Sequence, residues 1–145
     1  MEHIGKVVVR VIEKIKEGGR KDMEQKDLEG MGLLDADGYP SEEALEMIRR
    51  WDLRRGFKGL VELVQKLWRY LDYFKLYERR NSYWLRLATG GWSGNESIVG
   101  ALEENVVFYG FCWVMSARGG LHVYEIPKEM WERCSLRCHV VGEER

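Results

Sequence analysis

The chain of 145 residues has only two prolines and three cysteines, and it carries almost no net charge. No apolar run approaches the roughly 18 to 20 residues that a membrane-spanning helix needs, and charges interrupt the apolar residues at the N-terminus, unlike in a signal peptide. Hydrophobic residues make up 45% and charged residues 32%, a composition typical of a globular domain rather than of a disordered chain. We therefore expect one domain in the cytoplasm, with no membrane as partner.

The charge balance argues against nucleic acid as a partner of the chain as a whole. Lysine and arginine total 23 against 24 for aspartate and glutamate, a net charge of -1. Residues 41–80 are an exception, with ten basic and seven acidic residues. Nucleic-acid binding through the basic segment from Arg49 to Lys58 is therefore a weaker alternative, and it predicts a steep loss of affinity with salt. Arginine also anchors protein interfaces, so four residues of this segment are candidate partner-binding residues: Arg49, Arg50, Arg54 and Arg55.

The three cysteines do not form the even, closely spaced set of a disulfide-rich secreted domain. Cys134, Cys138 and His139 could supply metal ligands on neighbouring turns. Structural zinc sites usually contain two paired ligand motifs, whereas here there is one loose group. The simpler interpretation is that these cysteines and Cys112 are reduced and pack as small hydrophobic residues. We assign no metal.

The first half of the chain has the pattern of helices. Apolar residues recur at helical spacing over residues 4–16. A second helix is predicted to start after Ser41, whose hydroxyl can cap the exposed amides, with acidic residues following in the positive first turn. A third helix with a wide apolar face is predicted over residues 60–71.

The second half changes to the pattern of strands. Apolar residues alternate over residues 82–88, and a glycine turn then leads into a helix that includes residues 98–102. Residues 106–115 are apolar on both faces and predict a strand buried on both sides of a sheet. A second strand over residues 121–126 should form a hairpin with it, and residues 128–138 predict a short final helix.

Residues 89–96, which read TGGWSGNE, lie between the predicted strand and the predicted helix. Glycine permits positive φ and a close backbone approach, and the amides at a helix N-terminus carry partial positive charge, so this turn suits a phosphate or carboxylate. Its spacing matches neither the Walker pattern nor the dinucleotide fingerprint. The structural alternative is a tight turn in which Ser93 or Asn95 caps the helix and Trp92 covers the core. The candidate ligand-binding residues are Gly90, Gly91, Trp92, Ser93, Asn95 and Glu96, with Arg118 from a second turn.

The second turn is formed by Arg118, Gly119 and Gly120, before a strand in which His122 and Tyr124 share one face. It could bring a cation, an imidazole and a phenol near the first glycine turn. The structural alternative is a hairpin turn with a solvated arginine and a histidine that serves the fold. No Ser, His and Asp set and no carboxylate pair can be placed at a defined geometry, so we assign no catalytic residue and no cofactor.

Three blocks of the sequence resemble a known family. Residues 38–45 (GYPSEEAL) with Trp51 following, residues 89–96 and residues 118–120 are similar, in the same order, to blocks in a family of small uncharacterised proteins encoded by tailed bacteriophages. In that family histidine often follows the third block directly, whereas here a leucine separates it from His122. The resemblance implies no activity. It does imply a phage or prophage origin and action in the cytoplasm of the bacterial host, on host or defence proteins.

We therefore predict a single α+β domain over residues 1–145, with a helical half at about residues 1–80 and a sheet half at about residues 81–145. N-terminal helices precede a strand-helix-strand-strand unit that forms a small antiparallel sheet. The expected function is that of a phage-encoded, non-enzymatic binding protein that acts on a bacterial host or defence protein, for example as an anti-CRISPR-like inhibitor. The alternative is a small-ligand or nucleotide-binding domain, with or without enzymatic activity, that uses the glycine turn and Arg118.

Overall fold

The computed structural model describes residues 32–132. Within this range the chain is an α+β structure with a small antiparallel sheet, as the sequence predicts. The helix predicted over residues 4–16 lies outside the described residues, as do Cys134, Cys138 and His139.

The helical part of the described chain begins with α3 (Glu42–Arg49), and its predicted start is confirmed. The Ser41 hydroxyl accepts a hydrogen bond at 3.1 Å from a backbone amide in the first turn. A short 3-10 turn, η1 (Leu53–Arg55), leads to α4 (Phe57–Leu67), which buries a wide apolar face. The α4 helix ends before the predicted limit, and a second 3-10 turn, η2 (Leu71–Tyr73), follows it.

The sheet contains one strand more than the sequence analysis predicts. Its members are β1 (Phe74–Glu78), β2 (Ser82–Ala88), β3 (Trp113–Ala117) and β4 (Leu121–Pro127), in the spatial order β1-β2-β4-β3, with every neighbouring pair antiparallel. The extra strand β1 lies within the half predicted to be helical. Five residues are too few for an alternating pattern to stand out, and β1 owes its place to its pairing with β2.

The strand predicted over residues 106–115 is wrong. After α5 (Ser93–Glu104), the chain forms another helix, α6 (Val106–Cys112), and only then enters β3, whose residues are all exposed. A continuous apolar run fits a buried strand or a helix equally well. Here the Asn105 side chain accepts a hydrogen bond at 3.1 Å from the Phe108 amide, so it caps α6 and favours the helix. The predicted hairpin is confirmed, because β3 pairs with β4.

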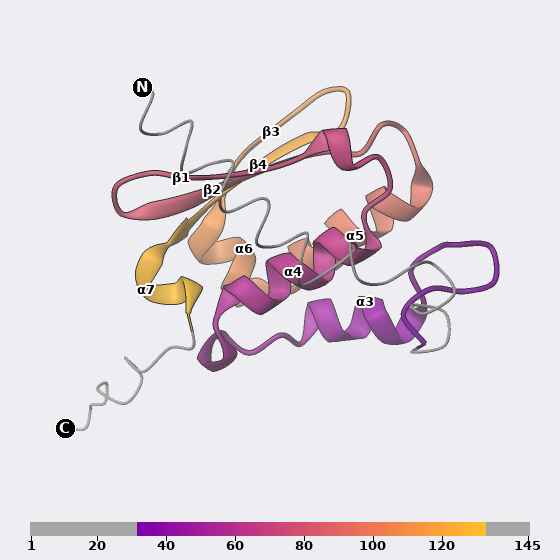
Figure 1. The fold of residues 1–145 in the computed structure, drawn as a ribbon, viewed down its shortest axis with the longest axis horizontal. Helices are drawn as coiled ribbons and strands as arrows, with labels where there is room; N and C mark the ends of the chain where they lie inside the picture. Colours follow the sequence, from indigo (N-terminus) through magenta and orange to yellow (C-terminus); the bar gives the residue numbers. More distant parts are fainter. Residues whose placement is uncertain (1–31, 133–145) are drawn as a thin grey trace.

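The helices lie together on one side of the sheet, as Figure 1 shows. The space between the two layers is filled by apolar side chains, and α3 packs against α5 on the far side of the helical layer. The final helix, α7 (Lys128–Trp131), brings the Trp131 ring to a centroid distance of 4.1 Å from the Tyr83 ring. The largest fully buried side chains are Trp68, Tyr124, Phe57, Phe108, Ile48, Leu60, Leu67, Leu76, Leu85 and Leu87.

Candidate functional site

The glycine turn that precedes α5 adopts the left-handed backbone that its sequence predicts. Gly90 and Gly91 have φ angles of 64° and 77°. A Cβ on Gly90 would lie 3.0 Å from the Tyr73 ring and 3.1 Å from the Tyr70 ring, so the turn also sits tightly against two tyrosines. Tyr70 is the one described non-glycine residue with positive φ, at 71°. The turn is therefore built around close backbone packing against the chain between α4 and β1.

Trp92 covers the first turn of α5. Its ring contacts the Tyr39 ring, at a centroid distance of 4.9 Å, and the Arg69 guanidinium, which lies 4.0 Å from the ring centroid. A Cβ on Gly94 would collide with the same indole, so Gly94 is needed for the ring to lie down over the helix. This arrangement matches the structural alternative, in which Trp92 packs on the protein, and the exposed fraction of the residue is only 9%.

Asn95 is fully buried and uses its whole amide to hold the backbone together. Its Nδ2 donates to the Arg69 carbonyl oxygen at 2.9 Å and to the Thr89 carbonyl oxygen at 3.2 Å, and its Oδ1 accepts from the Arg69 amide at 3.0 Å. The side chain therefore ties the start of α5 to Arg69, just after α4, and to Thr89, just after β2. It is not the helix cap, because the N-cap residue is Trp92 and no side chain caps this helix.

The second glycine turn lies directly beside the first. The Thr89 amide donates to the Gly120 carbonyl oxygen at 3.0 Å, and a Cβ on Gly120 would collide with the Thr89 hydroxyl. Arg118 is exposed in this turn. Of the candidate ligand-binding side chains, Ser93, Glu96 and Arg118 are thus exposed, while those of Trp92 and Asn95 are committed to the fold. Anion binding at this turn stays a prediction that rests on fewer side chains than the sequence suggests.

A contact that the sequence analysis missed joins Ser116 of β3 to His122 of β4. The serine Oγ and the imidazole Nδ1 are 2.8 Å apart, and the Trp113 Nε1 donates to the same Oγ at 2.9 Å. Burial lowers the pKa of His122, and the nearby carboxylates Glu103 and Glu96 partly oppose this shift. Serine activation needs a base held by a third group. Within residues 32–132 no hydrogen bond to the other imidazole nitrogen accompanies this pair.

The basic segment is neutralised by acidic residues of the same surface. Arg49 forms ion pairs with Glu42 at 2.8 Å, Glu46 at 2.9 Å and Glu104 at 2.7 Å, and the last of these links α3 to α5. The side chain of Arg49 is only 27% exposed. This arginine therefore stabilises the packing of two helices rather than presenting a charge to a partner.

The other three arginines of the segment are also engaged. Arg50 pairs with Glu46, and Arg54 pairs with Asp52 at 2.8 Å. The Arg54 guanidinium holds the pKa of the Asp52 carboxyl at about 2, well below its usual range. Arg55 lies over an aromatic ring, with its guanidinium 3.8 Å from the centroid of the Trp51 ring. Carboxylates therefore pair with three of the four arginines, and Arg55 is the one that contacts a ring instead.

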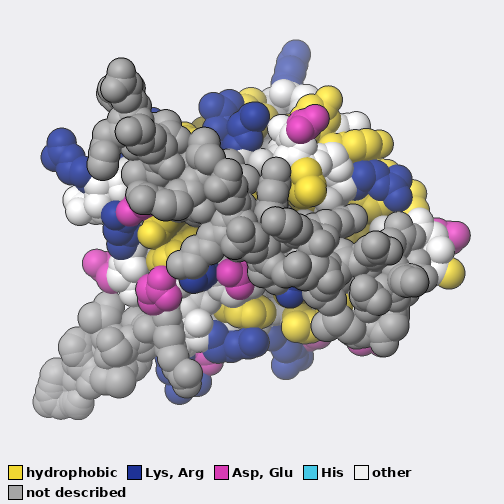
Figure 2. Space-filling model, viewed as in Figure 1, with side chains coloured by type: hydrophobic (Ala, Val, Ile, Leu, Met, Phe, Trp, Pro, Cys, Tyr) yellow, Lys and Arg dark blue, Asp and Glu magenta, His cyan; other side chains and the backbone are white. Residues whose placement is uncertain are grey.

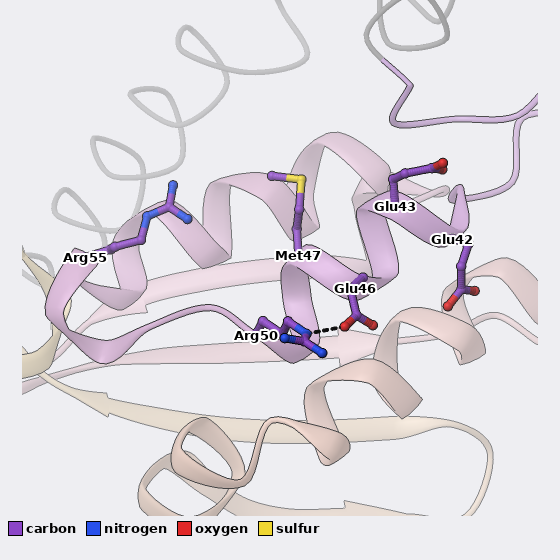
Figure 3. Close-up of a pocket in the computed structure, with 6 residues that line it drawn as sticks. All are labelled: Glu42, Glu43, Glu46, Met47, Arg50 and Arg55. Carbon is purple, nitrogen blue, oxygen red and sulfur yellow. Dashed lines mark hydrogen bonds and ion pairs between the residues drawn. The ribbon is translucent and has the colours of Figure 1, made fainter.

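A hollow of about 570 Å³ lies against this part of α3. Figure 3 shows that five of its six residues follow one another along and just beyond this helix, while Arg55 comes from η1. Arg50 and Glu46 point toward each other across its edge, and Met47 is 42% exposed. The remaining lining residues are Glu42 and Glu43.

Exposed large apolar side chains are concentrated on α6 and β3, and we call these residues the α6–β3 patch. Residues 106–117 contain no charged side chain. The strand β3 stands at the edge of the sheet and pairs on one side only, with β4. The exposed fractions of the patch residues run from 39% to 76%: Val106, Val107, Phe111, Trp113, Val114 and Met115.

Comparisons with known proteins give no relative: no family model, no curated protein and no solved structure matches the chain.

Among the described residues no group of three or more His, Cys, Asp or Glu side chains is placed to hold a metal ion. The helices of residues 32–132 are too short or too polar to span a membrane. Cys112 is free and buried, and burial raises the pKa of its thiol to about 12.

Proposed function

We propose that this protein is a non-enzymatic binding protein that docks on another protein through the α6–β3 patch. The observation that carries the proposal is the cluster of six large apolar side chains, each at least 39% exposed, on a stretch without any charge. Large exposed apolar patches on soluble proteins commonly mark interaction sites. Trp, Phe and Met are also enriched in the centres of protein interfaces.

The position of β3 supports the same proposal. As an edge strand it offers backbone amides and carbonyls along one side, and its sequence WVMSA has no charge or proline that would block pairing. A partner could therefore bury the apolar side chains and pair with the strand in one interface. A catalytic role is less well supported. Ser116 is exposed and His122 is half-buried, and no described residue acts as the third group that would hold the imidazole.

The partner we propose is a bacterial host or defence protein, met in the cytoplasm of the host cell. This part of the proposal comes from the resemblance of residues 38–45, 89–96 and 118–120 to small proteins of tailed bacteriophages. The α6–β3 patch by itself supports a protein partner but does not indicate what kind of protein that partner is.

The test is a comparison of two aspartate variants in affinity capture from bacterial lysate. Phe111→Asp places a charge in the patch, where Phe111 is 60% exposed, and Met47→Asp places the same charge on α3, where Met47 is 42% exposed. A protein captured by the wild type should be lost with Phe111→Asp and kept with Met47→Asp. A central aromatic anchor is worth about 2 kcal/mol or more, so the affinity should fall at least about 30-fold.

Both variants should melt close to the wild type, because both side chains are exposed. The proposal is overturned if the same proteins are captured with equal strength by the wild type and by Phe111→Asp. It is overturned equally if the purified partner binds in a way that Met47→Asp weakens and Phe111→Asp does not.

A further inference from the structure

The second face of the sheet carries a surface of a different kind. Along β1 and β2 alternate side chains turn away from the helices, and the strand register places Lys75 opposite Arg86 and Tyr77 opposite Trp84. The residues between them, including Leu76 and Leu85, are buried on the helical side. The two outward pairs therefore form neighbouring rows on the face of the sheet that Figure 1 shows opposite the helices.

The aromatic row consists of the stacked Tyr77 and Trp84 rings, which we call the platform. The Tyr77 and Trp84 rings are nearly parallel, with an interplanar angle of 11° and a centroid distance of 6.4 Å. The Arg79 guanidinium lies over both, 5.5 Å from the tyrosine centroid and 5.1 Å from the tryptophan centroid. Both rings keep partial exposure and Arg79 is exposed. Planar groups of this kind stack on the faces of nucleobases.

The cations around the platform are not neutralised as those of α3 are. Lys75, Arg79, Arg80 and Arg86 are all exposed, and none of them takes part in an ion pair among residues 32–132. One carboxylate is close by: Glu125 stands opposite Trp84 on β4 and accepts a hydrogen bond from Ser82 at 2.8 Å. Figure 2 shows Lys and Arg side chains beside apolar ones along the upper rim of the molecule, where Figure 1 places the sheet.

We propose that this face of β1 and β2 binds single-stranded nucleic acid. Cations that form no ion pair among residues 32–132, beside stacked aromatic rings, match the two properties of a single strand, its phosphate charge and its exposed base faces. The surface lies on the β1 side of the sheet, whereas the α6–β3 patch lies at the opposite edge. The inference thus goes beyond the proposed protein partner and stands or falls separately from it.

The experiment measures binding of the full chain to a labelled single-stranded RNA of about 12 nucleotides by fluorescence anisotropy, at salt concentrations from about 50 to 200 mM. Lys75→Gln combined with Arg86→Gln removes two exposed cations from the platform. Arg50→Gln combined with Arg54→Gln removes the same charge from the C-cap of α3 and from η1, where both arginines are paired with carboxylates, and serves as the matched control.

The Lys75→Gln and Arg86→Gln double variant should bind the RNA more weakly. The slope of the logarithm of its binding constant against the logarithm of salt concentration should become shallower by about 0.7 for each phosphate that is no longer neutralised. The control variant should change neither the affinity nor the slope. Tyr77→Ala should weaken binding at least about fivefold, the loss of one stacked base. An abasic strand with the same number of phosphates should bind more weakly than the normal strand. A single-stranded DNA of the same sequence distinguishes an RNA ligand from a DNA ligand.

Three outcomes overturn the proposal. If the protein shows no saturable binding to the RNA at about 50 mM salt, the proposal is refuted. Equal losses in the platform and control variants would show attraction by overall charge alone. Equal affinity for normal and abasic strands, or a preference for duplex, would show that the aromatic rings do not stack on bases. If Tyr77→Ala fails to fold, the glutamine variant and the abasic strand still decide the question.

Discussion

The glycine turn of residues 89–96 and the α6–β3 patch lie close together along the chain, yet their side chains have opposite surroundings. The turn has the more distinctive sequence, and its central side chains contact the protein itself: Trp92 covers α5, and Asn95 bonds three backbone groups. The patch has an ordinary apolar sequence, and Phe111 is 60% exposed. A distinctive motif can thus serve the fold, while a plain apolar run carries the surface for a partner.

The largest effect on stability should be seen with two phenylalanines of α6, one in the core and one in the patch. Phe108 is fully buried against the Phe57 and Tyr124 rings, whereas Phe111 is 60% exposed in the patch. Phe108→Ala should lower the free energy of unfolding by about 4 kcal/mol, and Phe111→Ala should change it by less than about 0.5 kcal/mol. Urea unfolding monitored by circular dichroism measures both. Similar losses for the two variants would mean that the patch is part of the core.

The next effect should come from the turn. Asn95→Ala leaves two carbonyl oxygens and one amide of the backbone without their partner, and each buried unsatisfied group costs about 1 to 3 kcal/mol. We expect a total loss of about 3 kcal/mol, seen as a melting temperature lower by about 10 °C. Ser93→Ala, at an exposed position of the same turn, is the control and should melt like the wild type. If Asn95→Ala is as stable as Ser93→Ala, the structural role of the turn is refuted.

A smaller effect should follow from Gly94→Ala, which tests the packing of the indole on the helix. The added Cβ collides with the Trp92 ring, which must move away from its place over the first turn. Overpacking costs about 1 to 3 kcal/mol, and the better helix propensity of alanine returns about 1 kcal/mol. A net loss of about 1 kcal/mol is therefore expected. Gly100→Ala, where a Cβ would meet nothing in the described structure, should instead stabilise the protein, and a stabilised Gly94→Ala would contradict the packing.

The smallest effect should be a pH dependence at His122, which lies between the two regions. Because burial lowers its pKa below 6.5, the unfolded chain binds a proton more readily than the folded chain does. The contribution of His122 to stability is therefore fully present above pH 6.5 and is lost as the pH falls from 6.5 toward the folded pKa.

Melting temperatures of the wild type and of His122→Asn at about pH 7.5 and 5.5 measure this contribution, since carboxylates titrate mostly below that range. Glu103 and Glu96 face the imidazole and weaken the shift, while Ser116 bonds its Nδ1. The melting temperature of the wild type should fall more than that of the variant. Equal changes in the two proteins would show that the folded structure does not lower the pKa of His122.

Local patterns predicted those elements whose cause lies within a few neighbouring residues. The cap at Ser41, the two-residue period of β2, the left-handed Gly90 and Gly91 and the β3–β4 hairpin all follow from side chains and backbone preferences close in the sequence. Within the candidate site the sequence located the turn and the exposed Arg118. The structural alternative placed Trp92 on the protein, but it did not predict that the Asn95 side chain would bond the backbone at Arg69 and Thr89.

The amino-acid pattern alone was therefore enough to establish the α+β class and the positions of its strongest local signals. Three-dimensional packing was needed to split residues 106–115 into a largely exposed helix and an edge strand, because an apolar run does not specify which of its faces meets the core. Likewise, the arginines of α3 and those of the sheet have the same chemistry. Carboxylates that approach from other turns and helices neutralise the first group, and strand pairing places the second group around aromatic rings.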